Sequence, residues 1–323
     1  MNMKMGERFM KDYAFGIDIG GTTVKMGLFT TDGVLQESWE IPTRKEEAGA
    51  HILPDIAEAM KAKLEEKGIS LDNVEGIGID VPGPVLEDKI VNRCVNLGWG
   101  VFDVTKELKS LIDIENIKVA NDANAAALGE MWKGGGEGHR NVVMITLGTG
   151  VGGGVIIDGK IVAGHFGAGG EIGHLLVNRF EERPCGCGKA GHLEQYASAT
   201  GIARRAKDVL ALSDRPSTLR DLPEVTAKDV FDHAKTGDIL AVEIVDFVGQ
   251  VLGGACSMIS AVVDPEIYVI GGGVSKAGEI LTSVIRKYFR SAAFHASEDA
   301  RFALAKLGND AGMYGAVKMV LAD

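Results

Sequence analysis

The chain has 323 residues and a formal net charge of −11, from 34 basic and 45 acidic side chains. This acidity, with no block of basic residues, argues against a phosphate-tracking surface, so we expect no nucleic-acid partner. No apolar run approaches the roughly 18–20 residues that span a bilayer, and the polar start MNMKMGERFMKDY predicts no signal peptide. We therefore expect a cytoplasmic protein of two domains without a membrane partner.

Glycine is unusually abundant, with 44 residues against only 8 prolines. There is no Gly-X-Y period, so neither collagen nor low complexity explains the excess. Fifteen of these glycines lie between Gly134 and Gly173, and some of the others form short groups, such as Gly20-Gly21 and Gly271–Gly273, after apolar runs. This grouping predicts turns in which the backbone adopts positive φ or approaches a ligand closely.

The apolar runs and turn residues predict a mixed α/β chain. A meander of three strands comes first, and a helix ending at Gly68 and a strand stopped by Pro82 follow. The expected strands are 14–19, 24–29, 34–41, 74–81, 117–120, 141–147 and 267–270; the expected helices are 57–67, 122–132, most of 199–263, and 313–321.

One pattern occurs twice. Residues 17–33 read as an apolar strand, a Gly/Thr turn, a second apolar run and Asp-Gly, and residues 145–159 repeat this order. Two such units predict a duplicated domain with a cleft between the halves. The alternative is that any two hairpins look alike at this level of detail.

The first copy of the pattern contains GIDIGGTTVK, residues 16–25. It is not a P-loop, because its glycine turn joins two strands. Its backbone N–H groups and the hydroxyls of Thr22 and Thr23 could form a nest for phosphate oxygens. Asp18, at the end of the strand, is placed to hold Mg²⁺ directly or through water. The alternative is an ordinary tight hairpin capped by Asp18.

Two further glycine clusters follow apolar strands: TLGTGVGGG at 146–154 and Gly271–Gly273. The last of these suits the close approach of an adenosine moiety. One such cluster is weak evidence, but three in one chain favour binding of nucleotide phosphates.

The segment NDAN, residues 121–124, lies where an expected strand meets an expected helix. The first interpretation of Asp122 is a helix cap. The functional alternative is a general base that takes a proton from an alcohol attacking a phosphoryl group.

A fourth cluster offers two imidazoles and two thiolates, which suit a closed, structural tetrahedral zinc site. A redox pair or plain loop residues are the alternatives, since C-x-C is tighter than the usual spacing. Glu171 and Glu194 flank this set, and carboxylates accept hydrogen bonds from sugar hydroxyls. The four candidate ligands are His174, Cys185, Cys187 and His192.

From Tyr13 onward the chain resembles the ROK family of bacterial glucokinases, related hexose and N-acetylhexosamine kinases, and transcriptional repressors. The resemblance implies the actin-like ATPase (ribonuclease-H-like) α/β fold, with two domains around a central cleft for ATP and sugar. It divides the chain into 1–122 plus 308–323, and 123–307. The motifs that carry it, in the family's order, are GIDIGGTTVK, VPGP, NDANAAALGE, TLGTGVGGG, EIGH, CGCGKAGHLE and IGGGV.

The resemblance also implies roles for residues. Asp122 resembles the catalytic base. The sugar ligands would be Asn121, Glu171, His174 and Glu194, with Gly83 and Asn96 nearby. The first phosphate loop would comprise Asp18, Gly20, Gly21, Thr22, Thr23 and Lys25; the second, Thr146, Gly148, Thr149 and Gly150; Gly271 and Gly272 would lie near the adenosine.

The zinc loop departs from the family pattern, which usually has a third cysteine where this chain has His192. Histidine is a competent zinc ligand, so we expect a Cys₂His₂ site. One nitrogen of His174 would bind zinc while the other meets a sugar hydroxyl, which would fix the ring orientation.

The activity implied is ATP-dependent, Mg²⁺-assisted phosphorylation of a hexose at its 6-hydroxyl, with glucose as the leading substrate and a homodimer as the expected assembly. HLEQYASATG, apart from its histidine, looks most like Gram-positive glucokinases. N-acetylmannosamine, N-acetylglucosamine or fructose as substrate and polyphosphate as donor remain open. A sugar-responsive repressor is a rival, although only about a dozen residues precede the first strand, too few for a helix-turn-helix domain. An actin-like assembly ATPase is another, but it would not need the zinc-braced carboxylates.

Overall fold

The computed structural model describes residues 10–321. Most of the polar start on which the signal-peptide prediction rests lies outside the described residues. The described chain forms two compact units, residues 10–132 with 163–168 and 309–321, and residues 133–162 with 169–308.

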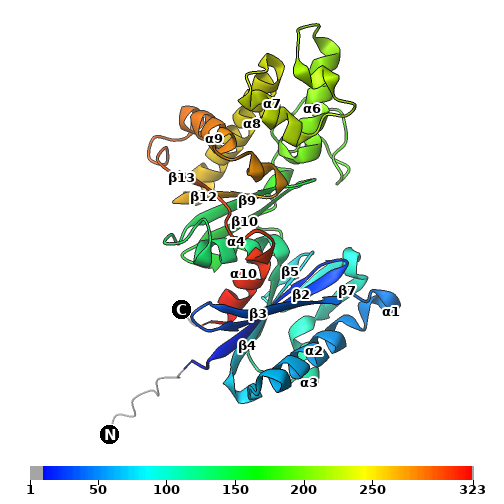
Figure 1. The fold of residues 1–323 in the computed structure, drawn as a ribbon. Coiled ribbons are helices and arrows are strands. Elements are labelled where there is room, and N and C mark those ends of the chain that lie inside the picture. The colour runs from blue at the N-terminus through cyan, green and yellow to red at the C-terminus, as the bar shows by residue number, and fades with distance from the viewer. Residues whose placement is uncertain (1–9, 322–323) are drawn as a thin grey trace. The chain divides into compact units, whose positions relative to one another are not determined.

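The first unit is built on a five-stranded sheet with the order β3-β2-β1-β4-β8 (Figure 1). The predicted meander is confirmed, because β1, β2 and β3 pair antiparallel, whereas β4 and β8 run parallel to β1. The strands are β1 (Tyr13–Ile19), β2 (Thr23–Thr30), β3 (Leu35–Pro42), β4 (Val74–Val81) and β8 (Ile117–Asn121).

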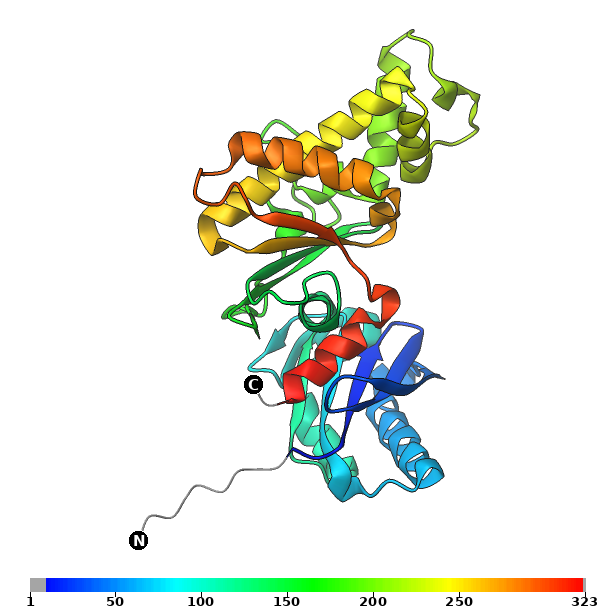
Figure 2. The same ribbon diagram turned by 60° about the vertical axis from the view of Figure 1, so that its left-hand side comes forward.

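Side-chain alternation gives this sheet two different faces. Phe15 and Ile17 of β1 belong to the core formed with α2 (Ile52–Lys67) and α3 (Val104–Leu111). Ala14 packs instead with α10 (Ala311–Val320), which covers the opposite face (Figures 1 and 2). A Cβ on Gly78 of β4 would lie 1.8 Å from the Ala316 carbonyl oxygen, so only glycine lets α10 approach this closely.

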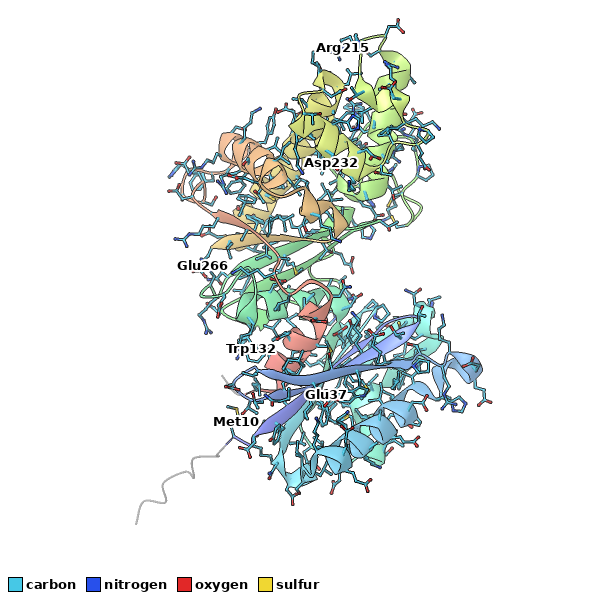
Figure 3. The ribbon with its side chains drawn as sticks, viewed as in Figure 1. Met10, Glu37, Trp132, Arg215, Asp232 and Glu266 are labelled. Carbon is cyan, nitrogen blue, oxygen red and sulfur yellow. The ribbon has the colours of Figure 1, made fainter. Side chains whose placement is uncertain are left out.

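Helix α2 ends as predicted, with Gly68 in the left-handed conformation at its C-terminus. The sheet and this helix are also joined by charge, since Glu37 of β3 accepts from Lys63 at 2.6 Å and from Lys67 at 2.5 Å (Figure 3). A small sheet in this unit was not predicted, because its strands are too short to show a period: β5 (Val85–Leu86), β6 (Ile90–Cys94) and β7 (Trp99–Asp103).

The second unit repeats the strand plan of the first. Its sheet has the order β11-β10-β9-β12-β13, in which β9, β10 and β11 are antiparallel and β12 and β13 run parallel to β9. The two turns of the sequence repeat therefore join corresponding strands, β1 to β2 and β9 to β10. The strands are β9 (Val142–Leu147), β10 (Val151–Ile157), β11 (Lys160–Ile161), β12 (Ile267–Gly271) and β13 (Arg301–Leu304).

Helices α8 and α9 lie side by side over this second sheet (Figure 2). Glu266, labelled in Figure 3, lies just before β12. It accepts from the backbone N–H groups of Arg140 and Asn141, both at 2.8 Å, and so fixes the entry to β9. The helical prediction for 199–263 is largely confirmed, whereas α9 was not predicted. The helices are α5 (Glu194–Ala197), α6 (Ala199–Leu212), α7 (Ala227–Lys235), α8 (Ile239–Val263) and α9 (Glu279–Ala292).

The expectation that no apolar run approaches the length of a bilayer span was wrong for one segment. Helix α8 has 25 residues and is long and apolar enough, by length and composition alone, to cross a bilayer. However, 56% of its most apolar window is buried inside the protein. That burial is typical of a core helix, and Leu252 and Cys256 are wholly buried beneath its neighbours.

Candidate functional site

Two carboxylates lie at the ends of the parallel strands of the first unit. Asp18 of β1 and Asp80 of β4 are register partners, and both fall on the alternation that faces α10 rather than α2. Asp80 is wholly buried, and neither of its carboxylate oxygens has a hydrogen-bond partner within the described chain. One of them lies 2.7 Å from where a Cβ of Gly312 would be, so it sits against the start of α10.

The electrostatics of this pair follow from burial. Burial raises the pKa of Asp18 above its ordinary value. It raises the pKa of Asp80 well above its ordinary value, and the negative charges of Asp18 and Asp122 add to this shift. The sequence analysis missed Asp80; an acid near the carboxyl end of the otherwise apolar run GIGIDV was the available signal.

The first phosphate turn joins β1 to β2. Gly20 N donates to Thr23 O at 3.0 Å, and the Thr43 hydroxyl donates to Gly20 O at 2.7 Å. Neither Gly20 nor Gly21 has positive φ, which leaves the close approach of a ligand as the expected reason for glycine here. A Cβ on Gly21 would meet nothing within 4 Å, so this backbone is open to an approaching group.

Lys25 of β2 lies beside this turn. It is the register partner of Asp18, and its Nζ donates to Asn309 O at 3.2 Å. A cation therefore lies close to the two carboxylates. A carboxylate, a lysine and open backbone N–H groups form an arrangement suited to phosphate oxygens and Mg²⁺.

Asp122 opens helix α4 (Asp122–Lys133). Asn121, rather than Asp122, caps most of the helix start, because its Oδ1 accepts from Ala123 N at 3.0 Å and Asn124 N at 3.3 Å. The exposed Asp122 carboxylate accepts from Ala123 N and from Asn121 Nδ2, each at 2.8 Å. These two donors hold the carboxylate in one orientation at the surface of the unit.

The predicted sugar residues of this unit lie together. Asn121 Nδ2 also donates to Gly83 O at 3.3 Å. A Cβ on Gly83 would lie 3.3 Å from the Cβ of Cys94. Asn96 is exposed in the short helix η2 (Val95–Leu97) that follows Cys94. Burial, with a smaller contribution from the charge of Asp122, raises the pKa of the Cys94 thiol.

The second phosphate turn joins β9 to β10. Gly148 N donates to Gly150 O at 3.0 Å, and the first residue of α6 donates its N–H to Gly148 O at 2.8 Å. Neither glycine has positive φ. A Cβ on Gly150 would lie 2.2 Å from a carboxylate oxygen of Glu194, and that oxygen accepts from Val151 N at 3.1 Å. This turn is therefore backed by Glu194.

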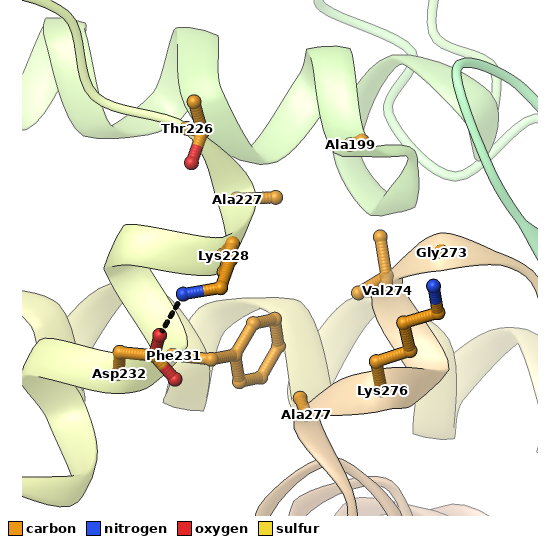
Figure 4. Close-up of a pocket in the computed structure, with 10 residues that line it drawn as sticks. All are labelled: Ala199, Thr226, Ala227, Lys228, Phe231, Asp232, Gly273, Val274, Lys276 and Ala277. Atoms are coloured by element: carbon orange, nitrogen blue, oxygen red, sulfur yellow. Dashed lines mark hydrogen bonds and ion pairs between the residues drawn. The ribbon is translucent and has the colours of Figure 1, made fainter.

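The third glycine cluster adjoins the second turn. Gly271 is the register partner of Thr146, and Gly272, with φ +80°, lies against the backbone of Leu147. A cavity of about 310 Å³ lies beside it, between the start of α6, helix α7 and the short helix η5 (Gly273–Ala277) (Figure 4). Phe231 and Val274 form apolar walls, and Lys228 and Asp232 pair at 2.6 Å at its edge.

Sequence analysis found only the glycines at the edge of this cavity. The side chains of its walls come from three separate elements, and no local pattern connects them.

The four predicted zinc ligands lie together in the second unit. One ligand atom of each, from His174, Cys185, Cys187 and His192, lies within 4.8 Å of the others. The Nδ1 atoms of the two histidines are 3.2 Å apart, and Cys187 Sγ is 3.4 Å from His192 Nδ1. A tetrahedral site with Zn–N of about 2.0 Å and Zn–S of about 2.3 Å needs ligand separations of roughly 3.3–3.8 Å. The residues therefore fit a zinc ion.

The geometry also connects this cluster to the second turn. Cys185 Sγ donates to the second carboxylate oxygen of Glu194 at 3.4 Å, so Glu194 bridges the cluster and Val151 N. His174 faces the cluster with Nδ1, which leaves Nε2 available to another group. Glu171 is exposed three residues before His174, and its carbonyl accepts from His174 N at 3.1 Å.

Comparison with known proteins agrees with the sequence motifs. Residues 14–323 match the model of the ROK family. A glucokinase from Halalkalibacterium halodurans is 43% identical over 305 residues, covering 93% of this chain and 92% of that protein.

Solved structures agree as well. A ROK family glucokinase from Streptomyces griseus, in complex with glucose and AMPPNP, has 32% identity and a TM-score of 0.67, covering 95% of this chain and 98% of that one. A ROK hexokinase from Thermus thermophilus has 29% identity and a TM-score of 0.74, covering 94% of this chain and 96% of that one. The predicted actin-like ATPase fold class is thereby confirmed, and this chain belongs to the ROK family.

Proposed function

We propose that this protein transfers the γ-phosphoryl group of ATP to the 6-hydroxyl of a hexose, with glucose as the leading substrate. The observation that carries the proposal is the Asp122 carboxylate, exposed at a helix start and oriented by Ala123 N and Asn121 Nδ2, in a chain 43% identical to a glucokinase. Phosphoryl transfer needs such a positioned base more than it needs covalent chemistry.

In the proposed reaction, Asp122 accepts the proton of the sugar 6-hydroxyl as its oxygen attacks the γ-phosphorus. The O6–P bond forms, the bond from phosphorus to the β–γ bridging oxygen breaks, and the products are hexose 6-phosphate and ADP. Asn121 serves twice, as helix cap and as a donor that orients the base. Gly83 and Asn96 would contact the sugar from the same unit.

The proposal assigns the remaining sugar contacts to Glu171, His174 and Glu194 of the second unit. It divides the chain functionally as predicted, into 1–122 plus 308–323 with the base, and 123–307 with the zinc cluster. His174 supports this assignment, because an imidazole with Nδ1 toward the cluster keeps Nε2 for a sugar hydroxyl.

ATP would use both glycine turns for its phosphates and the cavity beside Gly272 for its adenine. The apolar walls Phe231 and Val274 favour a flat, uncharged base. Asp18 and Lys25 are the residues that would hold Mg²⁺ and phosphate oxygens, and the ion would neutralise charge that develops on the phosphates. Zinc would be held by His174, Cys185, Cys187 and His192 and would stabilise the loop rather than react.

The expected setting of this activity is cytoplasmic, with the protein as a homodimer. The relatives include glucokinases over nearly their full length, which supports an ATP-dependent sugar kinase as the coarse assignment.

The test is a coupled kinase assay on the purified chain with glucose, mannose, fructose, N-acetylglucosamine and N-acetylmannosamine, each with ATP or polyphosphate. We expect the highest kcat/KM for glucose with ATP, and ³¹P NMR should identify a 6-phosphate monoester. A preference for an N-acetylated sugar would move the assignment to the hexosamine kinases. No turnover of any sugar, together with specific binding of upstream DNA, would replace the kinase by the repressor alternative.

A further inference from the structure

A second surface cavity of about 620 Å³ lies in the second unit, and none of the four metal-ligand candidates lines it. It is formed between helix α6 and the segment that leads to α7. Its apolar lining includes Leu210, Leu219, Leu222 and Val225, and Leu219 is wholly buried. The proposed reaction uses none of these residues.

The charged side chains that line this second cavity, called the groove below, are mostly cations. Arg204, Lys207 and Arg220 line it, against the single acid Glu224. In the described part of the chain, none of the three cations forms an ion pair with a carboxylate. Asp208, the acid next to Lys207 in the sequence, pairs instead with Arg183 at 2.9 Å. A chain of net charge −11 thus keeps a local excess of positive charge here.

Two of the cations are held in place without being neutralised. The Arg220 guanidinium donates to the carbonyl oxygens of Leu210 at 3.0 Å and Arg215 at 3.2 Å, and Arg204 donates to the Gln195 carbonyl oxygen. Carbonyl oxygens carry no net charge, so the positive charges remain available. The exposed Lys207 makes no side-chain hydrogen bond to the described residues, so its ammonium group is available to a ligand.

We propose that this groove binds a small organic anion, with its carboxylate or phosphoryl group on Lys207 and the two arginines and its apolar body on the leucine lining. The cations disfavour a neutral apolar molecule, and the apolar floor adds nothing for a bare inorganic ion. The ligand class is therefore an amphipathic anion rather than a sugar or free phosphate.

The groove and the proposed adenine cavity are both lined by helix α6 and by the segment that leads into α7. Ala199 of α6 lines the adenine cavity and Lys207 of the same helix lines the groove. Likewise, Val225 lines the groove and the next residue, Thr226, lines the adenine cavity. The test must therefore show which cavity a probe occupies.

The test is titration calorimetry of the full chain with octanoate, octanol and inorganic phosphate as separate probes. We expect one octanoate to bind per chain. Octanol and phosphate should bind about tenfold more weakly or not at all, because octanol lacks the anionic group and phosphate lacks the apolar body. Lys207→Glu should weaken octanoate binding by about tenfold or more, and Lys207→Gln by less.

Two control variants make the result specific. Lys61→Glu changes an exposed lysine in a cavity of the first unit where Glu58 and Glu65 already balance the charge, and Lys276→Glu changes the adenine cavity. Both should bind octanoate as the parent does. Equal binding of octanol, loss of binding in Lys276→Glu, unchanged binding in Lys207→Glu, or no octanoate binding at all would each overturn the proposal.

Discussion

The two units share one strand plan but differ in the chemistry at the turn that follows the first strand. In the first unit the turn lies beside Asp18 and the fully buried Asp80, so two carboxyl groups lie together there. In the second unit the corresponding turn is backed by Glu194, which connects it to a cluster of histidines and cysteines. A common scaffold thus fixes where the turns lie, whereas side chains from other elements decide what each turn does.

The largest expected effect separates the roles of the two units. Asp122→Asn removes the proposed base while the helix cap on Asn121 stays, so kcat should fall by about 10²- to 10⁴-fold. Sugar binding, measured by calorimetry, should persist. Glu194→Gln in the second unit should instead act mainly on KM, because Glu194 is assigned to binding. Near-normal turnover of Asp122→Asn would show that Asp122 is not the base.

Metal removal tests whether only the second unit depends on zinc. Elemental analysis should give one zinc per chain. Chelation should lower the melting temperature, because bound zinc stabilises the folded state by about 4 kcal/mol when free zinc is present at a thousand times its Kd. Cys187→Ser should reproduce the loss, and added zinc should not restore it.

A substitution at His192 tests the fourth ligand. His192→Cys restores the cysteine usual in the family and should retain zinc. A protein that binds no zinc, or whose melting temperature is unchanged by Cys187→Ser, would contradict the assignment.

Two glycines, one packed against the end of β9 and one in the turn that follows it, test how much each position depends on the absence of a side chain. Gly272→Ala places a Cβ 2.5 Å from the Leu147 carbonyl oxygen at a residue with φ +80°, so unfolding should be easier by about 2–4 kcal/mol. At Gly148 a Cβ meets nothing within 4 Å, so Gly148→Ala should change stability by less than about 0.5 kcal/mol. It should nevertheless weaken nucleotide binding if phosphates approach this backbone. Denaturant unfolding and nucleotide titration measure the two effects.

The smallest effect concerns the buried acid of the first unit. Asp80 has a folded-state pKa well above its ordinary value of 3.8, so the folded state holds the proton more tightly than the unfolded state. Its ionisation therefore destabilises the fold as pH rises above about 3.8, and Asp80→Asn should stabilise the protein at neutral pH. Below that pH the difference should vanish.

Asp103 provides the control with the opposite sign. This acid caps α3, and the Thr105 hydroxyl and the Lys106 N–H hold its pKa below the ordinary value. Its stabilising contribution is present above the ordinary pKa and is lost as pH falls, so Asp103→Asn should destabilise slightly at neutral pH. The midpoints of urea unfolding at several pH values measure the effects of Asp80→Asn and Asp103→Asn. If Asp80→Asn stabilised the protein equally at every pH, ionisation of Asp80 would not be the cause.

Much of the site was accessible from the sequence because it lies at the ends of strands. Asp18, Asp122 and the glycine turns follow apolar runs, and the predicted strands and the helix at 122–132 are found within a few residues of their expected bounds. The four zinc candidates also lie together, as their residue types predicted, although C-x-C is tighter than the usual spacing. Gly20, Gly21, Gly148 and Gly150 do not have positive φ, so of the two reasons expected for grouped glycines only the close approach of a ligand applies to them.

By itself the sequence determined the strand and helix periods, the repeated hairpin and the clusters of reactive side chains, all of which depend on neighbours along the chain. Only the tertiary structure decided that Asp80 lies buried next to Asp18, that Glu194 backs the second turn, and that α6 and α7 enclose a cavity. These features depend on contacts between residues far apart in the sequence. Burial and charge at such contacts are set by packing, which local patterns do not encode.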